Sequence, residues 1–501
     1  MDANDKPHAV CMPSPAQGHI NAMLQLAKLL HSLHDFHITF VLTRLNFNRI
    51  LSTSAGDELP PFCNTVQSDD LINQPSSFDV LPDFRCEAIQ DGLQRSDPNS
   101  GEELSELCDS VRNNLADHFR QLVKRLNHEN RGPKVTCIVS DTYSSFTLDI
   151  AAEIGVPDVS FCSVSACGFW GFYCFKELLE RGIVPLKSED DLSNGYLETC
   201  IDWIPGKSMR LRDFPSFVRT TNPNDSVFNF CKDESENAKK ANAIIINTFN
   251  DLEAPVLDAM SAQLPPVYAV GPLTLMCDKI RDAALKNFRF NLWQEESACL
   301  QWLDRKANGS VVYVNFGSMA VLSSEQLVEF AWGLADSGRE FLWVIRSNMV
   351  SGDLATLLPA GFSSAVTSER GLLTSWCPQG EVLMHPAIGG FMTHCGWNST
   401  MESISRGVPM ICWPYFGDQQ TNCYYACNEW GIGVELGNDV KRKDVEGLIR
   451  EILGGEKGKE MREMTLKWKE SAIRSTEPGG KSFMNMEKVI REVLLEDNKH
   501  I

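Results

Sequence analysis

The 501-residue chain lacks a long apolar run and an excess of basic side chains. Residues 1–6 are polar, and the uncharged stretch from Val159 to Phe175 is short and rich in Ser, Cys and Gly. We therefore expect neither a signal peptide nor a membrane anchor. Lys and Arg total 46 against 66 Asp and Glu, a formal net charge of −20, which argues against nucleic acid as a partner.

Common cofactor and metal motifs are also absent from the sequence. It contains no G-x-G-x-x-G, no P-loop lysine motif, no Asp-x-Asp pair and no Cys/His cluster with zinc spacing. The 17 cysteines show no paired spacing and are interpreted as buried reduced thiols of a cytoplasmic protein, with Cys395 and Cys412 as core residues. We expect no metal and no resident cofactor.

Alternating apolar runs and amphipathic stretches indicate an α/β protein. His8–Met12 and His37–Leu42 are expected strands around a helix at Asn21–Leu30, which is typical of a parallel sheet. Asn242–Asn247 is expected to end this half, and the alternation restarts at Ser310. Further expected elements are a helix over Glu103–Leu126 and strands over Phe84–Ile89, Val135–Ser140, Val159–Phe161, Val311–Phe316, Phe341–Ile345 and Leu372–Thr374.

The most informative stretch runs from Trp376 to Gln419. Ile388–Thr393 reads as a buried strand, and a Gly-containing turn leads to helical spacing over Thr400–Arg406. Asn398 or Ser399 can cap this helix. A strand, a turn and a helix N-terminus make an anion site, because free backbone N–H groups point at the ligand.

Three side chains of this stretch narrow the ligand further. His394 adds a donor at the strand end, and Trp376 offers a flat face to a base. Glu402 lies one turn into the helix, where a carboxylate suits sugar hydroxyls and not phosphate. The set indicates a nucleotide that carries both phosphates and a sugar.

The stretch resembles, nearly position for position, the signature box of the plant secondary-product UDP-glycosyltransferases. The resemblance extends to Pro15-Ala-Gln-Gly-His19, Ile138-Val-Ser-Asp141 and Asn315-Phe-Gly-Ser318, so it spans the chain. It implies two facing Rossmann-like domains with a cleft between them, the GT-B architecture. The domains are an acceptor domain at 1–258, a UDP-sugar domain at 259–481 with a linker at 259–297, and a helix at 482–501 that packs back on the first.

The resemblance also implies a donor site built almost entirely from the box. Its expected members are Trp376, Cys377, Gln379 and Glu402 for uracil and ribose, Ser318, His394, Gly396, Asn398 and Ser399 for the diphosphate, and Trp397, Asp418, Gln419 and Ser163 for the hexose. Gln419 favours UDP-glucose, because galactose-using relatives tend to carry His there.

His19 and Asp141 are the catalytic candidates, since each is expected at the carboxyl end of a strand. A neutral histidine can accept a proton, and a carboxylate on its Nδ1–H would fix the tautomer and stabilise the imidazolium. From the residues alone, His19 could equally be a loop histidine and Asp141 a helix N-cap. The resemblance implies a general base with its partner in an inverting transfer.

The acceptor is defined less well. Apolar residues that could line its pocket, and that suit a small lipophilic alcohol, phenol or acid, are Phe84, Ile89, Phe169, Trp170, Phe172, Tyr196, Ile204 and Phe416. Ser165-Ala-Cys-Gly-Phe169 and Asp202-Trp-Ile-Pro-Gly206 resemble the subgroup that glucosylates terpenoids and cyanohydrins. A terpenoid is expected first, with phenolic, cyanohydrin or cytokinin-like acceptors as alternatives.

Two functions from other classes are alternatives to this one. A dinucleotide-dependent oxidoreductase could use twin Rossmann units, but its phosphate fingerprint is missing. A non-catalytic binding protein would not need both His19 and Asp141. We expect a monomeric glucosyltransferase whose partners are UDP-glucose and a small lipophilic acceptor.

Overall fold

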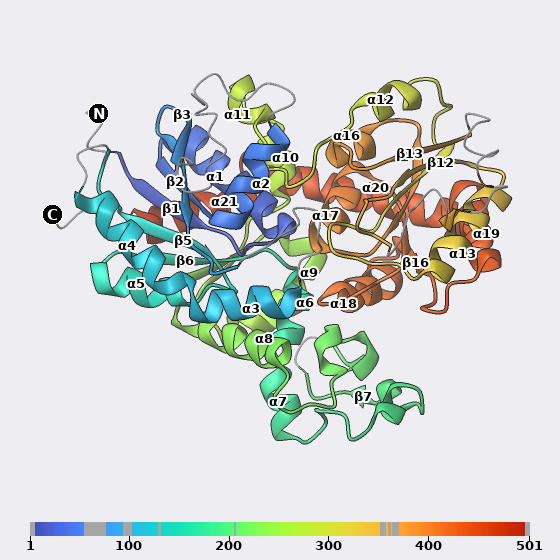
Figure 1. Cartoon of the computed structure of the whole chain (residues 1–501), viewed down its shortest axis with the longest axis horizontal. Coiled ribbons are helices and arrows are strands. Elements are labelled where there is room, and N and C mark those ends of the chain that lie inside the picture. The colour runs from blue at the N-terminus through green and yellow to red at the C-terminus, as the bar shows by residue number, and fades with distance from the viewer. Residues whose placement is uncertain are drawn as a thin grey trace.

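A computed structural model of the chain describes residues 6–54, 77–93, 103–128, 132–204, 207–350, 357–358, 362 and 370–495. These residues form two α/β domains that lie next to each other along the long axis of the molecule (Figure 1), as the sequence predicts. Pro205 and Gly206, and most of the loop expected around residues 91–100, lie outside the described residues. Within the described ranges, no helix is long and apolar enough to cross a membrane.

The first domain is built on an eight-stranded sheet with the order β10-β9-β6-β5-β1-β2-β4-β3. Its described strand pairs are parallel, apart from β3 with β4. The strands are β1 (His8–Met12), β2 (His37–Thr43), β3 (Ser77–Leu81), β4 (Phe84–Ile89), β5 (Cys137–Asp141), β6 (Asp158–Cys162), β9 (Ala243–Ile246) and β10 (Val267–Ala269).

Helices cover both faces of this sheet, as a parallel sheet requires. Along β1, Val10 and Met12 join one hydrophobic cluster and Ala9 and Cys11 join the other. The first face carries α3 (Leu104–Asn113), α4 (Leu115–His128), α5 (Phe146–Ile154), α6 (Ala166–Tyr173), α8 (Ser226–Asn237), η5 (Ala238–Lys240) and α9 (Asn250–Ser261). The second face carries α1 (Gln17–His34), α2 (Arg44–Ser54), α10 (Leu273–Cys277) and α11 (Ala283–Asn287).

The prediction of a single helix over Glu103–Leu126 is wrong in one respect, because the chain forms two helices, α3 and α4, that are separated at Asn114. The Asn114 side-chain amide donates to the carbonyl of Asp91 at 3.1 Å. Asparagine side chains compete in this way with regular backbone hydrogen bonding.

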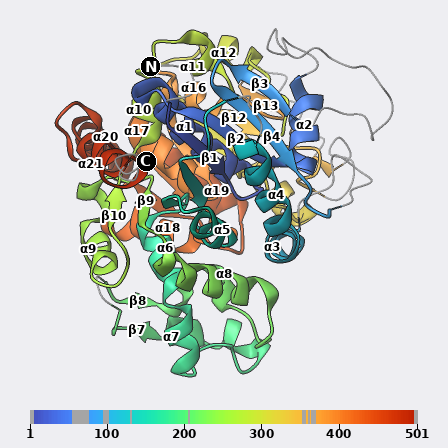
Figure 2. The ribbon, with the colours of Figure 1, turned by 90° about the vertical axis from the view of Figure 1, so that its left-hand side faces the viewer.

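A small lobe follows α6 and projects below the first sheet in both views (Figures 1 and 2). It contains α7 (Phe175–Glu180), β7 (Cys200–Ile201), β8 (Met209–Arg210), η1 (Glu189–Leu192), η2 (Tyr196–Glu198), η3 (Leu211–Asp213) and η4 (Ser216–Val218).

The second domain is built on a six-stranded sheet with the order β13-β12-β11-β14-β15-β16, and its strand pairs are parallel. The strands are β11 (Val311–Asn315), β12 (Glu340–Val344), β13 (Gly371–Thr374), β14 (Ile388–Thr393), β15 (Met410–Cys412) and β16 (Gly433–Glu435). Its helices are α12 (Ala298–Leu303), α13 (Ser324–Asp336), α16 (Gln379–Met384), α17 (Trp397–Arg406), α18 (Gln419–Tyr424), η6 (Tyr425–Glu429), α19 (Arg442–Gly454) and α20 (Glu456–Thr476).

The first domain continues beyond the boundary that the sequence predicts at residue 258. β10 pairs with β9 from Val267 with Ile244 to Ala269 with Ile246, so Asn242–Asn247 does not hold the last strand of this half. A strand this short, directly after a pair of prolines, gives little periodicity for a sequence pattern to detect.

The last helical segment of the described residues returns to the first domain. α21 (Lys481–Val489) and η7 (Ile490–Leu494) bury four apolar side chains in the cluster on the second face of the first sheet, namely Met486, Val489, Ile490 and Leu494. The Asn485 amide donates to the carbonyl of Ala269 in β10 at 2.9 Å. Figure 1 shows α20 on the side of the second domain and α21 beside the first sheet.

Candidate active site

The catalytic candidates lie at the carboxyl edge of the first sheet. His19 is in the first turn of α1, which follows β1, while Asp141 ends β5 and Ser163 follows β6. Since β1 pairs with β5 and β5 with β6, three adjacent strands bring these side chains together.

His19 and Asp141 form the hydrogen-bonded pair that the resemblance implies. His19 Nδ1 lies 2.8 Å from Asp141 Oδ2 and 2.7 Å from Ser163 Oγ. An ionised carboxylate only accepts hydrogen bonds, so Nδ1 carries the proton and Nε2 keeps its lone pair. That tautomer is the one a general base needs.

Both oxygens of Asp141 are held in place. Oδ1 accepts from Ser14 Oγ at 3.1 Å and from the Tyr143 N–H at 3.0 Å. Oδ2 accepts from Ser163 Oγ at 3.0 Å in addition to His19. The N-cap of α5 is Ser145, so the alternative role of Asp141 as a helix cap does not apply.

The charges of this pair shift both pKa values. Loss of hydration lowers the pKa of His19, but the Asp141 carboxylate and the nearby Asp418 more than compensate, so that it lies above its ordinary value of 6.5. Burial would raise the pKa of Asp141, but His19, the Tyr143 N–H and Ser163 hold it below 3.8. The pair therefore favours an ionised carboxylate and a histidine that binds its proton readily.

A row of aromatic rings, the aromatic wall (Tyr143, Phe172, Phe217 and Phe416), leads from His19 to the second domain. Tyr143 lies edge-on to His19 and to Phe172, with centroid separations of 6.0 and 5.9 Å. Phe172 is 6.0 Å from Phe217, which is 6.3 Å from Phe416. Two expected acceptor residues, Phe172 and Phe416, thus belong to one row of rings that begins at His19.

Helix α6 supplies Phe172 and is fixed at its first turn. Its N-cap Ser165 accepts from the Gly168 N–H at 2.9 Å, and the buried Glu253 carboxylate accepts from Cys167 N–H at 2.8 Å. Phe169, another expected acceptor residue, lies on the same helix, is fully buried and stacks on Tyr173 with centroids 6.5 Å apart.

In the second domain, the donor turn (residues 393–397) joins β14 to α17. The His394 ring lies between Gly317 and Gly396, where an added Cβ would come within 2.5 and 2.4 Å of its Nε2 atom. Only glycine fits beside this ring. Loss of hydration, together with the Arg346 charge, lowers the pKa of His394 to about 4, so the ring is neutral at neutral pH.

The start of α17 differs from the prediction. The helix begins at Trp397, its N-cap is Gly396, and no side chain caps it. Asn398 and Ser399 bond elsewhere: Asn398 Nδ2 donates to the Gly18 carbonyl at 2.7 Å, and Ser399 Oγ accepts from Gln379 at 2.9 Å. The first-turn N–H groups are therefore without a side-chain cap, as an anion site requires.

Gln379 supports Glu402 in place of offering its amide to a base. Its Nε2 donates to Glu402 Oε2 at 2.8 Å, while its Oε1 accepts from Asn315 Nδ2 at 2.9 Å. Loss of hydration raises the pKa of Glu402 despite this bond. Gln379 orients the carboxylate that is expected to meet the ribose.

Trp397 and Asn398, the first two residues of α17, connect the domains. Trp397 Nε1 donates to the carbonyl of Asn247 after β9 at 2.9 Å, so its indole N–H is already bonded. Asn398 reaches Gly18, the residue before His19. The expected hexose and diphosphate contacts of these two side chains therefore compete with bonds between the domains.

Asp418 and Gln419 lie at the start of α18, and Asp418 is near enough to His19 for its charge to raise the histidine pKa. Burial raises the pKa of Asp418 to about 6, and its Oδ2 accepts from Asn422 at 2.8 Å. Gln419 Oε1 accepts from the N–H groups of Tyr415 and Phe416 at 2.9 and 3.0 Å. The amide oxygen of Gln419 is thus occupied, which leaves its NH₂ group to donate.

The remaining donor residues line the edge of the second sheet. Trp376 is half-buried beside Trp293, with centroids 6.2 Å apart. Cys377 is buried, with its sulfur 3.3 Å from the Tyr313 hydroxyl, and Ser318 is half-buried after β11.

Three expected acceptor residues lie elsewhere. The prediction that Phe84 lines the acceptor pocket is wrong, because Phe84 begins β4 and packs on His31 with ring centroids 5.7 Å apart. Ile89 lies five residues further along the same strand, with a rise of about 3.3 Å per residue, and so ends β4 at the edge of the sheet that carries His19 and Asp141. Tyr196 belongs to the small lobe, where its hydroxyl donates to the Ile183 carbonyl at 2.9 Å, and Ile204 is buried after β7.

Sequence reasoning missed Ser14, Tyr143 and Asn315. Ser14 lies in the predicted loop after β1, and Tyr143 lies two residues beyond Asp141, so proximity to the motifs was the available signal. Asn315 lies within one of the family motifs, and it connects Gln379 to the Gly317 N–H. The Tyr143 hydroxyl is buried and has no hydrogen-bond partner among the described residues.

Comparison with known proteins matches this site to one family. The model of the family described as UDP-glucoronosyl and UDP-glucosyl transferase matches residues 289–478. The 7-deoxyloganetin glucosyltransferase of Gardenia jasminoides is 50% identical over 494 residues, covering 98% of each chain. The (R)-mandelonitrile beta-glucosyltransferase of Prunus dulcis is 49% identical over 496 residues, again covering 98% of each.

A solved structure shares the fold. UGT2 of Phytolacca americana, in complex with UDP-2fluoro-glucose and pterostilbene, superposes with a TM-score of 0.73 at 26% identity, covering 97% of this chain and 99% of that one. The predicted GT-B architecture of two facing Rossmann-like domains is confirmed.

Proposed function

The chain belongs to the UDP-glucoronosyl and UDP-glucosyl transferase family, and we propose that it transfers glucose from UDP-glucose to a hydroxyl or carboxyl group of a small lipophilic plant metabolite. A terpenoid is the first candidate, because the Gardenia jasminoides relative is named for 7-deoxyloganetin. A cyanohydrin is the second, because the Prunus dulcis relative is named for (R)-mandelonitrile.

One contact carries this proposal. The carbonyl of Gly18, next to the base His19, accepts a 2.7 Å hydrogen bond from Asn398 at the start of α17. The base and the donor turn are therefore adjacent across the domain boundary, as direct transfer from a bound UDP-sugar to a bound acceptor requires.

His19 and Asp141 act on the acceptor in this proposal. His19 Nε2 takes the proton of the acceptor hydroxyl while the acceptor oxygen forms its bond to C1 of glucose. Asp141 stabilises the imidazolium that results, through the 2.8 Å bond to Nδ1. The bond from C1 to the β-phosphate oxygen breaks, and UDP leaves.

Neutral donors support the departing diphosphate. The uncapped first turn of α17, the neutral His394 ring and Ser318 lie around the donor turn. Fixed donors of this kind lower the barrier where negative charge develops. We therefore propose that turnover needs no divalent ion.

The transfer proceeds with inversion in this proposal. A covalent glucosyl intermediate would need a carboxylate oxygen that is free to attack C1. In Asp141, hydrogen bonds from Ser14 and the Tyr143 N–H engage Oδ1, and those from His19 and Ser163 engage Oδ2. The α-linked donor then gives a β-glucoside. Proton NMR of a product made in excess EDTA tests both points: an α-anomer, or activity that returns only with Mg²⁺, would contradict them.

The substrates are tested by competition. Equal concentrations of UDP-glucose, UDP-galactose and UDP-glucuronate, offered with a panel of terpenoid alcohols, aryl cyanohydrins, phenols and cytokinins, rank the donors and acceptors by kcat/KM. We expect UDP-glucose and a terpenoid alcohol to rank first. Preference for another nucleotide sugar would overturn the assignment of UDP-glucose as the donor. Preference for a phenol would overturn the assignment of a terpenoid as the acceptor.

We also propose a cytoplasmic monomer. The free cysteines of the described residues support a reducing compartment. Light scattering of the purified chain and imaging of a fluorescent fusion in plant cells test the two statements, and a dimer or a vacuolar signal would contradict them.

A further inference from the structure

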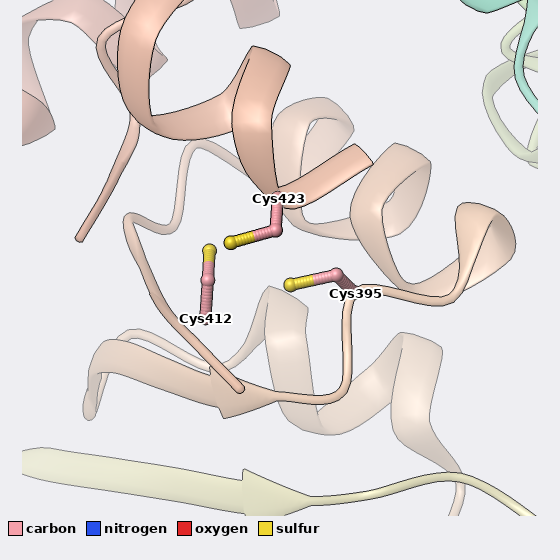
Figure 3. Close-up of side chains that lie close together, drawn as sticks. All are labelled: Cys395, Cys412 and Cys423. Atoms are coloured by element: carbon pink, nitrogen blue, oxygen red, sulfur yellow. The ribbon is translucent and has the colours of Figure 1, made fainter. Parts of the chain in front are cut away.

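A cluster of thiols lies behind the donor turn of the second domain. Cys395 lies within the turn, Cys412 ends β15 and Cys423 lies in α18. Their Sγ atoms all lie within 4.8 Å of one another, and all three residues are buried. Figure 3 shows the three sulfur atoms pointing toward a common centre. These residues are called the thiol cluster below.

Cys427 supplies a fourth sulfur beside the cluster. It lies in η6, one turn after Cys423. A Cβ added to Gly433 would lie 2.9 Å from Cys412 Sγ and 3.4 Å from Cys427 Sγ, so both sulfurs border the same point. Cys427 is only half-buried, which gives the cluster a side open to solvent.

We propose that the thiol cluster, with Cys427 as the fourth ligand, binds a thiophilic divalent cation of the zinc class. A zinc–sulfur bond is about 2.3 Å long, so three sulfurs around one ion lie about 4 Å apart. The cluster needs only small side-chain adjustments to reach that spacing. Four sulfurs are the ligand set of many structural zinc sites, and soft thiolates disfavour Mg²⁺ and Ca²⁺.

Binding exchanges protons for the ion and requires no oxidant. Each of the four thiols loses its proton to solvent as its sulfur bonds the ion. Four thiolates and one divalent ion leave two negative charges, as in other zinc sites with four cysteine ligands.

The position of the cluster gives the ion a structural role. Cys395 lies between His394 and Gly396, and Cys423 lies one turn after Gln419, the first residue of α18. A bound ion would tie the turn expected to hold the diphosphate to the helix expected to hold the hexose. The ion would not touch the reacting atoms, so we expect the metal-free enzyme to keep its turnover. Binding of the ion should raise the thermal stability of the chain.

The first experiment is a titration of the reduced full-length chain with Cd²⁺ alone, followed through the ultraviolet charge-transfer absorption of cadmium–thiolate bonds. We expect saturation at one ion per chain, loss of the signal when Zn²⁺ is added, and a higher Tm with either ion. Cys412→Ala should abolish all three effects. Cys200→Ser, which removes an exposed thiol, and Cys137→Ala, which removes a buried thiol of the first domain, should leave them unchanged.

A second experiment does not depend on the folding of a variant. The unaltered chain is alkylated with iodoacetamide with and without Zn²⁺, and labelling is mapped by mass spectrometry. We expect Zn²⁺ to protect Cys412, Cys423 and Cys427 but not Cys200. Protection confined to Cys299 and Cys377, which belong to another buried cluster of the second domain, or absence of protection and of cadmium binding, would overturn the proposal.

Discussion

The strength of His19 as the proposed base depends on side chains that no sequence pattern connects with it. Ser14 and Ser163 both donate to Asp141, and each bond favours the ionised carboxylate. The ionised carboxylate in turn raises the pKa of His19. The residues that set the proton affinity of His19 therefore come from the loop after β1 and the ends of β5 and β6.

The pH dependence of kcat/KM should report this coupling. In the proposed mechanism His19 acts only when neutral, and its pKa lies above 6.5, so kcat/KM should rise as pH increases through that pKa and be low beneath it. Asp141→Asn removes the charge, which should move the rising limb to lower pH and reduce the plateau. His19→Ala should cost about 10²–10⁴ in rate with an aliphatic alcohol.

Calorimetry with UDP supplies the control for these two variants, because neither residue is expected to contact the nucleotide. If the rising limb of the kcat/KM–pH profile is unchanged in Asp141→Asn, or if His19→Ala keeps near-normal turnover, the assignment of the base is contradicted.

Gln379→Ala should weaken nucleotide binding indirectly, through the loss of its hydrogen bond to Glu402. Glu402 loses its 2.8 Å bond and, with a pKa already raised, protonates more readily. A hydrogen bond to a charged group contributes about 1.5–3 kcal/mol, so we expect the Kd for UDP to rise about tenfold or more. Gln326→Ala, which removes a capping side chain of α13, is the matched control. Equal Kd values for both variants would refute this role.

The sequence predicted which residues gather at the site better than what each does there. The proximity of His19 and Asp141 is confirmed, because strand ends of neighbouring parallel strands meet at one edge. Gln379, through its side chain or its backbone, was expected to contact uracil and Trp397 the hexose, and the side chains of both make internal hydrogen bonds. Their partners lie far away in sequence, so no local pattern identifies them.

At the scale of secondary structure, the donor turn shows what a motif can specify. The sequence predicted a strand, a glycine turn and a helix in the right order, because hydrophobic periodicity and glycine are local signals. The helix start was wrong by three residues, since the predicted caps Asn398 and Ser399 bond to Gly18 and Gln379 instead. Contacts between elements decided the boundary.

Gly396→Ala tests how tightly the donor turn is packed. The backbone of Gly396 has a φ of −59°, which alanine accepts, but the new methyl would lie 2.4 Å from His394 Nε2 and must displace the ring. We expect a higher KM for UDP-glucose with little change in Tm. Gly447→Ala in α19 meets no atom within 4 Å and should leave KM unchanged while stabilising its helix by about 1 kcal/mol. Equal KM values in the two variants would show that His394 does not depend on this packing.

For the whole molecule, two Rossmann-like domains were predictable because each repeats the same local alternation. The contacts that join them were not. The bonds of Trp397 to Asn247 and of Asn398 to Gly18 link residues 150 and 380 positions apart. The thiol cluster was missed for the same reason, because β15 and α18 approach the donor turn only in the folded chain.

The C-terminal helix offers a matched pair of methionines with which to measure its contribution. Met486 is 2% exposed within the core of the first domain, whereas Met484, on the same helix, is 58% exposed. We expect Met486→Ala to lower the free energy of unfolding by about 2–5 kcal/mol and Met484→Ala to change it by less than about 0.5 kcal/mol. Chemical denaturation followed by fluorescence measures both. Equal losses would mean that α21 does not support the first domain in solution.

The return of α21 also bears on how the protein is made. Met486, Val489, Ile490 and Leu494 complete a core whose other members belong to the first half of the chain and its connection to the second. A ribosome translates these four residues only after the entire second domain. The first domain therefore emerges with an unfilled apolar face, which must wait for the rest of the polypeptide before it can close. During that interval the nascent chain presents a surface that chaperones can recognise.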